Sequence, residues 1–428
     1  MDEKRRSRRD FLQNITIVLL SLSAAALMAQ TQLYNLGAGA VGLSLRHLLG
    51  SGDTAAPGSA TAQTTGLAAP VRVAVTGAYG RYGDVALVTT QEAFRPLGSL
   101  LGEALGSAGT YAACTEAEFL AALKDTSIYY DALSPLPLAV LAETVGAAAE
   151  GPAARALALS DTGTEVRLYL WDGEETYRFS TTAVSQGDLE SAVNRYELGN
   201  AVFAWDRAET DPAYAAVAPL SLLLPDAPPE LPVLQAAMPL SDTDGLLTAL
   251  RFNPRTNYRY PESNGTEAVV DGERSLRIRA DGTVRYQGGS EAALTIDAAD
   301  PAAPTVLEAA TGAAALVGGL LSASGDAAPY LESVTQSGAS TVLRFGYQAG
   351  GVPIRFADGS AAAEVTLTGS TVSSLTLRFR QYTASGETSL LLPLRQALAI
   401  AAQTPGAALS IGYADGGGSS VSACWLAD

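Results

Sequence analysis

The sequence predicts an α+β fold, in which a single N-terminal transmembrane helix precedes extracytoplasmic domains of antiparallel sheets packed with helices. Three observations predict this class. A basic stretch at residues 1–10 is followed by an uncharged apolar run. Several short segments alternate apolar and polar residues and are joined by Asp-Gly or Gly-rich turns, as β-hairpins are. Segments with helix-capping residues lie among these hairpins, which is typical of sheets covered by helices.

The N-terminus predicts a cytoplasmic tail (1–10) and a transmembrane anchor (11–30). The tail carries five basic residues against three acidic ones; the basic residues, Lys4, Arg5, Arg6, Arg8 and Arg9, are expected to orient the anchor. The 19 residues from Phe11 to Ala29 carry no charge, and a helix of that length spans about 28 Å, close to one hydrocarbon core. Positively charged flanks stay in the cytoplasm. We therefore expect a single-pass protein of the cell membrane whose bulk is extracytoplasmic.

Two alternatives to a retained anchor remain open. Ala24-Ala25-Ala26 offers the small residues that a signal peptidase accepts. The run Ser7-Arg8-Arg9-Asp10-Phe11-Leu12 matches a twin-arginine export signal. A retained anchor is the preferred interpretation. Within it, Ser21, Ala25 and Ala29 form one stripe of small residues on which a partner helix can pack closely.

The exported part is expected to consist of a tether and three folded domains. Residues 31–69 are rich in Gly, Ala, Ser and Thr and predict a flexible tether. The first domain (70–224) is predicted to contain a strand from Pro70, helices over 94–107 and 115–123, and a hairpin over 165–180. Four prolines between Pro225 and Pro232 predict a linker after it.

The second and third domains are predicted mainly from alternating strands. The middle domain (233–299) has its clearest hairpin at 274–279 and 283–287, where apolar residues alternate with arginines. The C-terminal domain (305–428) is predicted to open with an Ala-rich helix over 305–323. Strands over 341–347, 352–356, 363–368 and 372–382, a helix over 394–403 and a hairpin over 409–425 are expected to follow.

The composition excludes several classes of function. A net charge of −17 with a pI near 4.5 argues against nucleic-acid binding, because an acidic surface repels phosphate. A single histidine, His47 in the tether, excludes a Ser-His-Asp triad in the folded part. Lys124 is the one lysine of the exported part and stands in no Ser-x-x-Lys motif. The chain is therefore expected to be non-enzymatic and to need no metal or cofactor.

The two cysteines leave two possibilities. Cys114 and Cys424 are separated by 310 positions and could form a disulfide outside the cell. Their Ala and Trp neighbours favour two buried free thiols instead.

A basic tail, one anchor and an acidic α+β ectodomain together resemble the YycH family of membrane-anchored regulators. The stretches that carry the resemblance are 102–108 with 118–120, Gly272 to Ile278 leading to Gly282–Tyr286, and 392–398 through Ile411-Gly412-Tyr413 to Trp425. These proteins are accessories of the WalK–WalR two-component system in low-GC Gram-positive bacteria. The resemblance implies contacts with a sensor histidine kinase and with a YycI-like anchored sibling protein, which shift the kinase–phosphatase balance.

Two functions therefore stand as hypotheses. The first is an anchored regulator that acts through its transmembrane helix and ectodomain. The second is an exported envelope hydrolase or polymer-binding protein that uses carboxylates. A deep cleft with acidic pairs, lined by Trp171 or Trp205, would favour the second hypothesis.

Overall fold

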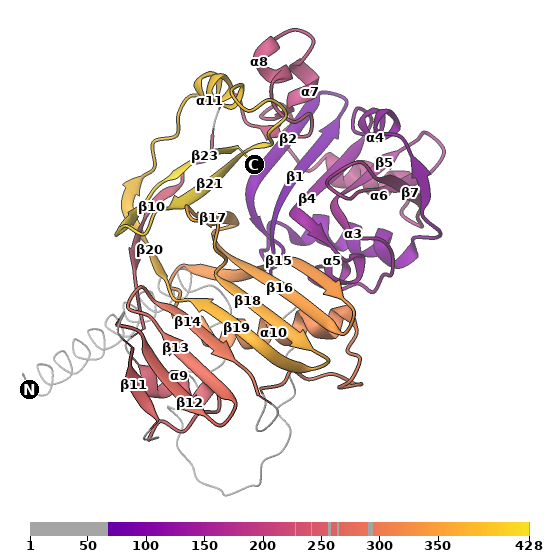
Figure 1. Cartoon of the computed structure of the whole chain (residues 1–428). Helices are drawn as coiled ribbons and strands as arrows, with labels where there is room; N and C mark the ends of the chain where they lie inside the picture. The colour runs from indigo at the N-terminus through magenta and orange to yellow at the C-terminus, as the bar shows by residue number, and fades with distance from the viewer. Residues whose placement is uncertain are drawn as a thin grey trace, which may run out of the picture. The chain divides into compact units, whose positions relative to one another are not determined.

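The computed structural model describes residues 67–428, apart from positions 227, 241, 256–257, 263–264, 290–293 and 428. The described residues form one compact unit (Figure 1). The expected cytoplasmic tail, anchor and nearly all of the tether lie outside the described residues. Among the helices of the described part, none is long and apolar enough to cross a membrane.

The first half of this unit is built on a seven-stranded antiparallel sheet. Its strand order is β2-β1-β4-β5-β6-β7-β3. In chain order the strands are β1 (Pro70–Gly77), β2 (Gly80–Val88), β3 (Ala112–Cys114), β4 (Ser127–Leu136), β5 (Ala154–Asp161), β6 (Val166–Trp171) and β7 (Tyr177–Thr181). The three neighbouring strands β1, β4 and β5 are mostly buried, with Val73, Val75, Ile128 and Leu159 all inaccessible to solvent.

Short helices surround this sheet. They are α3 (Arg95–Ser107), α4 (Glu116–Ala122), α5 (Leu138–Thr144), α6 (Gln186–Val193), α7 (Ala204–Arg207) and α8 (Pro212–Ala215), with a small ladder of β8 (Val202–Phe203) and β9 (Leu222–Leu223). Helix α6 packs on β1, β4 and β5. Helix α4 begins where the sequence predicts it, because Thr115 and Glu118 form a reciprocal capping box.

The second half contains an eleven-stranded sheet. Ten strands follow the order β11-β12-β13-β14-β19-β18-β16-β17-β21-β23, and β15 pairs with β16. Their bounds are β11 (Arg259–Pro261), β12 (Glu267–Asp271), β13 (Arg274–Ile278), β14 (Thr283–Gln287), β15 (Ala327–Ser337), β16 (Ser340–Ala349), β17 (Val352–Phe356), β18 (Ala363–Thr368), β19 (Thr371–Arg378), β21 (Leu409–Asp415) and β23 (Ala423–Ala427). All pairs are antiparallel except β17 with β21.

Helices cover one face of this large sheet. Helix α10 (Val306–Leu320) packs on β15, β16 and β18, and it starts at a capping box between Thr305 and Glu308. Helix α9 (Thr243–Ala249) is followed by Leu250 and Phe252, and the Phe252 ring meets Tyr286 of β14 edge-on. Figure 1 views the sheet from the opposite side, with α10 and α9 behind the strands. One face of β13, β14, β19 and β18 is therefore buried and the other is open.

A three-stranded sheet joins distant parts of the chain. Strand β10 (Pro232–Ala237) lies between β20 (Gln381–Thr388) and β22 (Ser420–Val421), and helix α11 (Leu394–Ala401) follows β20. Strand β14 of the expected middle domain pairs with β19 of the expected C-terminal domain. The division into domains 70–224, 233–299 and 305–428 stays a prediction, but strand pairing crosses the boundary near residue 300.

The two large sheets meet through two kinds of contact. The Ser134 hydroxyl of β4 donates to the Glu332 carbonyl of β15 at 2.5 Å. The β16–β17 turn lies against β2, where a Cβ on Gly351 would come within 2.6 Å of the Leu87 amide nitrogen. Gly351 also has φ +85°, so this close approach requires glycine.

Most of the predicted elements are confirmed, including the hairpins β6–β7 and β13–β14 and the helices α3, α4, α10 and α11. The antiparallel α+β class is confirmed as well. One predicted strand, 372–382, is wrong in extent. Strand β19 ends at Arg378, and the chain turns at Phe379, whose amide donates to the Gly282 carbonyl at 3.0 Å, before β20 begins in another sheet.

Candidate functional site: an arginine row on an open sheet face

The open face of the large sheet carries a row of residues directly opposite one another on adjacent strands, and all but one of them have polar side chains. Backbone register places seven residues in this row: Tyr260, Ala268, Arg277, Arg285, Thr376, Glu364 and Arg344. We call these seven residues the arginine row. Their strand neighbours on the buried face are apolar, as Leu276, Tyr286 and Leu375 show, and each of these three is at most 2% exposed.

Arg277 and Arg285 face each other across β13 and β14. Two like charges directly opposite on neighbouring strands destabilise a sheet. The Arg277 guanidinium is half exposed and donates to the Glu262 carboxylate at 3.1 Å. Arg285 is exposed and makes no ion pair or side-chain hydrogen bond with the residues that the structure describes. A cationic group therefore stands open at the centre of this face.

The next row along the same face adds two more arginines. Arg279 lies 3.9 Å from the Asp281 carboxylate, and Arg378 is directly opposite Thr283. The Arg378 guanidinium donates to both carboxylate oxygens of Asp358 at 2.8 and 3.0 Å. Hydrogen bonds from Ser360, together with this guanidinium, lower the pKa of Asp358 to about 2.

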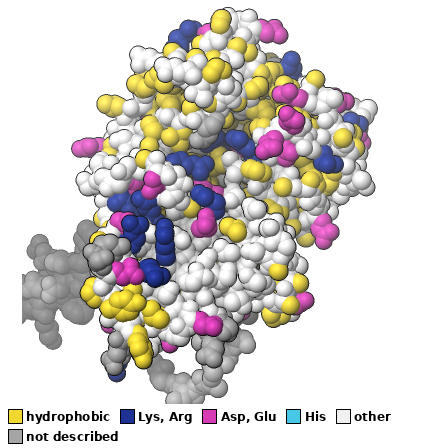
Figure 2. Space-filling view, viewed as in Figure 1, with side chains coloured by type: hydrophobic (Ala, Val, Ile, Leu, Met, Phe, Trp, Pro, Cys, Tyr) yellow, Lys and Arg dark blue, Asp and Glu magenta, His cyan; other side chains and the backbone are white. Residues whose placement is uncertain are grey.

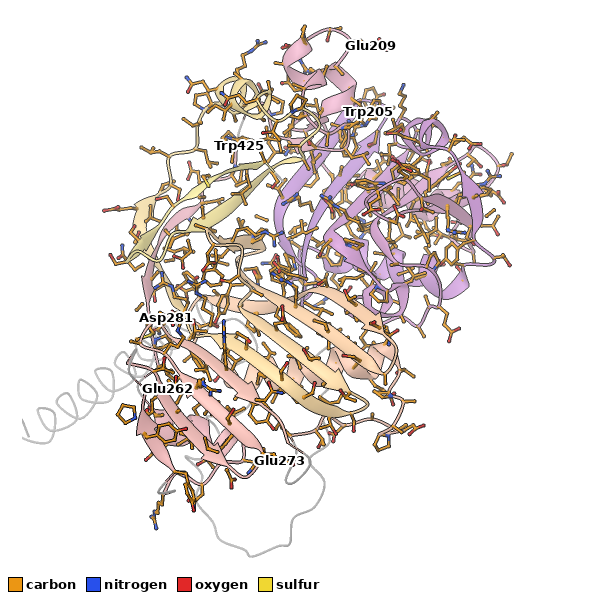
Figure 3. The ribbon with its side chains drawn as sticks, viewed as in Figure 1. Trp205, Glu209, Glu262, Glu273, Asp281 and Trp425 are labelled. Atoms are coloured by element: carbon orange, nitrogen blue, oxygen red, sulfur yellow. The ribbon has the colours of Figure 1, made fainter. Side chains whose placement is uncertain are left out.

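Figure 2 shows these arginines as a dark-blue cluster over β13, β14 and the end of β19, with hydrophobic side chains over β11 and β12 beside it. Tyr258 and Tyr260 are 70% and 48% exposed there. Figure 3 places Glu262 and Asp281 at the margin of the same face. The surface thus combines guanidinium groups with exposed phenol rings.

The far end of the arginine row borders a cavity of about 300 Å³. Its lining includes Arg344, Arg355, Glu332 and Ser360. Arg355 pairs with Glu332, and Arg344 lies 3.5 Å from the Glu364 carboxylate. Because each of these two arginines has a carboxylate partner, the charge at this end is locally balanced. The uncompensated charge of the row, among the described residues, is therefore that of Arg285, since Arg277 pairs with Glu262.

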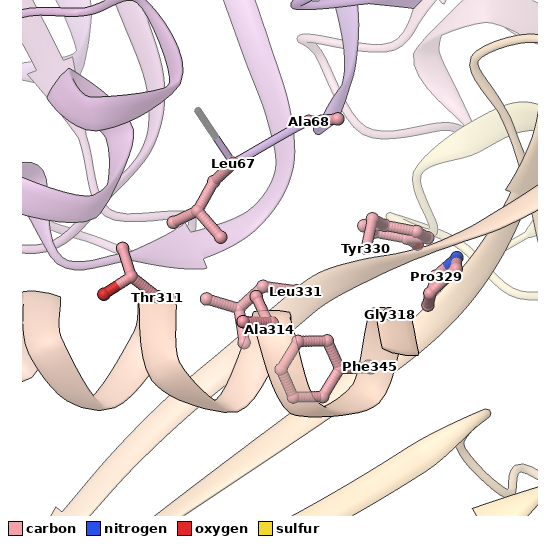
Figure 4. A pocket seen from close by; sticks show the side chains of 10 residues that line it. Leu67, Ala68, Thr311, Ala314, Gly318, Pro329, Tyr330, Leu331 and Phe345 are labelled. Atoms are coloured by element: carbon pink, nitrogen blue, oxygen red, sulfur yellow. The ribbon is translucent and has the colours of Figure 1, made fainter. Parts of the chain in front are cut away.

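A larger cavity, of about 450 Å³, lies between α10 and the start of the first sheet (Figure 4). Its described walls are formed mainly by Leu67, Ala314, Leu331 and Phe345, together with Tyr330 and Thr311. No Asp or Glu is among the described residues that line it. It is an apolar cavity and does not have the acidic pair that a carboxylate hydrolase needs.

The two tryptophans expected to mark a cleft have structural contacts. The Trp171 indole N–H donates to the Glu174 carbonyl at 3.0 Å, and its ring stacks on Tyr177. Trp205 stacks on Phe203 and receives the Lys124 ammonium 5.1 Å from its ring centre. Lys124 therefore takes part in a cation–π contact.

The other motifs noted in the sequence have local roles. Gly77 to Gly80 form the tight β1–β2 turn, and Asp242 caps α9 by accepting from the Gly245 amide at 2.7 Å. Cys114 and Cys424 are free and only partly buried. The described residues include no group of three His, Cys, Asp or Glu side chains arranged to hold a metal ion.

The site residues predicted from the sequence are not among those the structure describes. Ser21, Ala25 and Ala29, together with Lys4, Arg5, Arg6, Arg8 and Arg9, lie in residues 1–66. The arginine row was not predicted as a site, although alternating arginines mark β13, β14 and β19 in the sequence. The missing information was the register, which alone brings Arg277 and Arg285 face to face.

Comparison with protein-family models, with curated proteins and with solved structures found no match to this chain.

Proposed function

We propose that this chain is a membrane-anchored extracytoplasmic regulator that has no chemistry of its own and acts by binding other proteins. In this proposal residues 11–30 anchor it, and its partners are a sensor histidine kinase and a YycI-like anchored sibling. Binding to one state of the kinase more tightly than to another shifts the balance between them. The alternative, an envelope hydrolase, is not favoured by any site described above.

The observation that carries the proposal is the open pair formed by Arg277 and Arg285. Two exposed like charges directly opposite each other lower the stability of a sheet. A solvent-facing sheet that keeps such a pair is typical of a surface used for binding. Arginine and tyrosine are also among the side chains that are enriched in protein interfaces. Both types lie side by side on this face.

The proposal is tested by photo-crosslinking in living cells from position Ala25, followed by mass spectrometry. We expect recovery of a histidine kinase or of a second single-pass protein. Position Leu27 provides the control, because two residues correspond to about 200° around a helix and place it opposite Ala25. Crosslinking at 25 but not at 27 would also locate the contact on the Ser21–Ala29 stripe.

Two results would contradict the proposal. One is a shortened protein released from the membrane fraction, which would mean that the anchor is cleaved. The other is an intact membrane protein that yields no crosslinked kinase or sibling from either position.

A further inference from the structure

We infer that the arginine row, centred on Arg277 and Arg285, is a docking surface for an acidic segment of a protein partner. This inference rests on the proposed function and specifies which face of the ectodomain makes the contact. The occupant is a polypeptide that presents Glu or Asp side chains. It is argued from charge complementarity, from the dimensions of the row and from the side chains that flank it.

The charge argument begins with the carboxylates that face the row. Glu262 pairs with Arg277, Glu364 is close to Arg344, and Asp358 pairs with Arg378. Arg285 lies between these pairs and has no such partner in the described part of the chain. An incoming carboxylate can therefore bind Arg285 without breaking an existing ion pair, and guanidinium groups bind carboxylates in a bidentate way.

The row also matches the size of a protein interface. Tyr260 and Arg344 are separated by six strand-to-strand steps, which is about 29 Å at the usual strand spacing. A standard interface covers about 800 Å² on each partner, or a patch roughly 28 Å across. The exposed rings of Tyr258 and Tyr260 at one end supply apolar contact area that a purely ionic ligand would not use.

The overall charge favours a short acidic segment over a long polyanion. The chain carries a net charge of −17, so a polymer that extends beyond the row meets a repelling surface. A protein segment confines its negative charge to the contact area. Beyond the row, neutral side chains such as the exposed Gln287 and the half-buried Ser374 can form hydrogen bonds with such a segment.

The test uses the full chain in detergent and an eight-residue peptide of alternating Glu and Thr, labelled with fluorescein. Fluorescence anisotropy is measured at low ionic strength. We expect saturable binding that weakens as salt is added, because the contact is between exposed charges. Arg285→Glu and Arg277→Glu should each weaken binding by about tenfold or more. Arg285→Gln should give a smaller loss of affinity and serves as the milder variant.

Arg195→Glu is the matched control, because it changes the net charge by the same amount at an exposed position after α6. Circular dichroism confirms that every variant is folded. Equal loss of affinity in Arg195→Glu and Arg285→Glu would overturn the inference, since net charge alone would then explain the effect. Absence of saturable binding to the peptide would also overturn it.

Sodium tripolyphosphate, used as a competitor, distinguishes the class of ligand. If it displaces the peptide at much lower concentration, and if Arg285→Glu abolishes its effect, the face binds phosphate chains and the assignment to an acidic protein segment is wrong. The two proposals fail separately. Crosslinking of a kinase from position 25 without peptide binding would retain the regulator and discard this docking surface.

Discussion

Arg380 and Asp415 form a buried, two-pronged ion pair that joins the residue just before β20 to the end of β21. The Arg380 Nε and Nη2 atoms donate to the two carboxylate oxygens of Asp415, each at 2.9 Å. Asp415 is 2% exposed and also accepts from the Tyr382 hydroxyl at 2.8 Å and the Gly417 amide at 2.7 Å.

Removing one member of this pair should destabilise the fold strongly. Arg380→Ala leaves the Asp415 carboxylate buried without its cation, and we expect the free energy of unfolding to fall by about 3–5 kcal/mol. Urea denaturation followed by tryptophan fluorescence measures it. In the double variant Arg380→Met with Asp415→Leu we expect a smaller loss, because no charge is left unpaired. A loss below about 1 kcal/mol in Arg380→Ala would contradict this account.

The same pair predicts how stability depends on pH. Burial alone would raise the pKa of Asp415, but hydrogen bonds from Arg380, Gly417 and Tyr382 hold it below its ordinary value. A carboxyl group whose pKa is lowered by folding adds stability above its unfolded pKa of about 3.9. That stability is lost as pH falls through the lower pKa of the folded state. In Asp415→Asn the free energy of unfolding should therefore fall less steeply than in the parent protein as the pH is lowered below about 4.

Arg285 is expected to lower the free energy of unfolding, because it lies directly opposite Arg277. Arg285→Thr removes one of two directly opposed positive charges, and we predict a gain of about 0.2–1 kcal/mol in the free energy of unfolding at low salt. Thermal melts at low and at high ionic strength measure the gain. The gain should shrink as salt screens the repulsion. If Arg285→Thr melts lower than the parent protein at low salt, Arg277 and Arg285 do not repel each other.

Arg251 occupies a position that favours glycine. It follows α9 with φ +60°, and the Phe252 amide donates back to the Leu247 carbonyl at 2.8 Å, as in a Schellman motif. We predict that Arg251→Gly stabilises the protein by about 1 kcal/mol, by relieving the left-handed backbone. Differential scanning calorimetry tests this, and Arg251→Ala provides a control that keeps the strain. A lower melting temperature in the glycine variant would contradict it.

Cys114 should react slowly with alkylating agents. Burial, together with the nearby Glu118 carboxylate, raises the pKa of the Cys114 thiol to about 11. At pH 8 the thiolate fraction is then about a hundredfold lower than for a thiol of pKa 9. Iodoacetamide labelling followed by mass spectrometry should show slow modification at pH 8, which speeds up towards pH 11. Fast labelling at pH 8 in the folded protein would contradict this.

Local signals in the sequence were sufficient for the elements that they define. The Thr115 and Thr305 capping boxes mark two helix starts, and the Asp-Gly turns at 172–173 and 281–282 mark two hairpins. Such signals act over a few residues. They do not determine which hairpin lies beside which, so the pairing of β14 with β19 could not be predicted. The end of β19 at Arg378 was missed for the same reason, because the polar–apolar alternation of residues 374–380 continues past it.

The arginine row shows the same limit at the level of the site. Alternation predicts that Arg277 and Arg285 point away from the core. Their direct opposition depends on the length of the turn between β13 and β14, and the extension of the row to Arg344 depends on three further strand pairs. Charged residues that share one face of a single strand can be identified from the sequence. A row that crosses several strands can be identified only when the strand pairing is known.

The position of β10 has a consequence for how the protein is made. Its Gln235 pairs with Thr383 on one side and with Ser420 on the other, 148 and 185 residues further along the chain. At about 5–20 residues per second, synthesis of the first of these partners takes roughly 7–30 s after β10 itself. During that time both edges of an apolar strand that contains Leu234 have no partner from β20 or β22. Folding of this region therefore has to wait until β20 and β22 have been synthesised. A mutation that slows synthesis or export after residue 237 prolongs the period in which β10 can pair with the wrong strand.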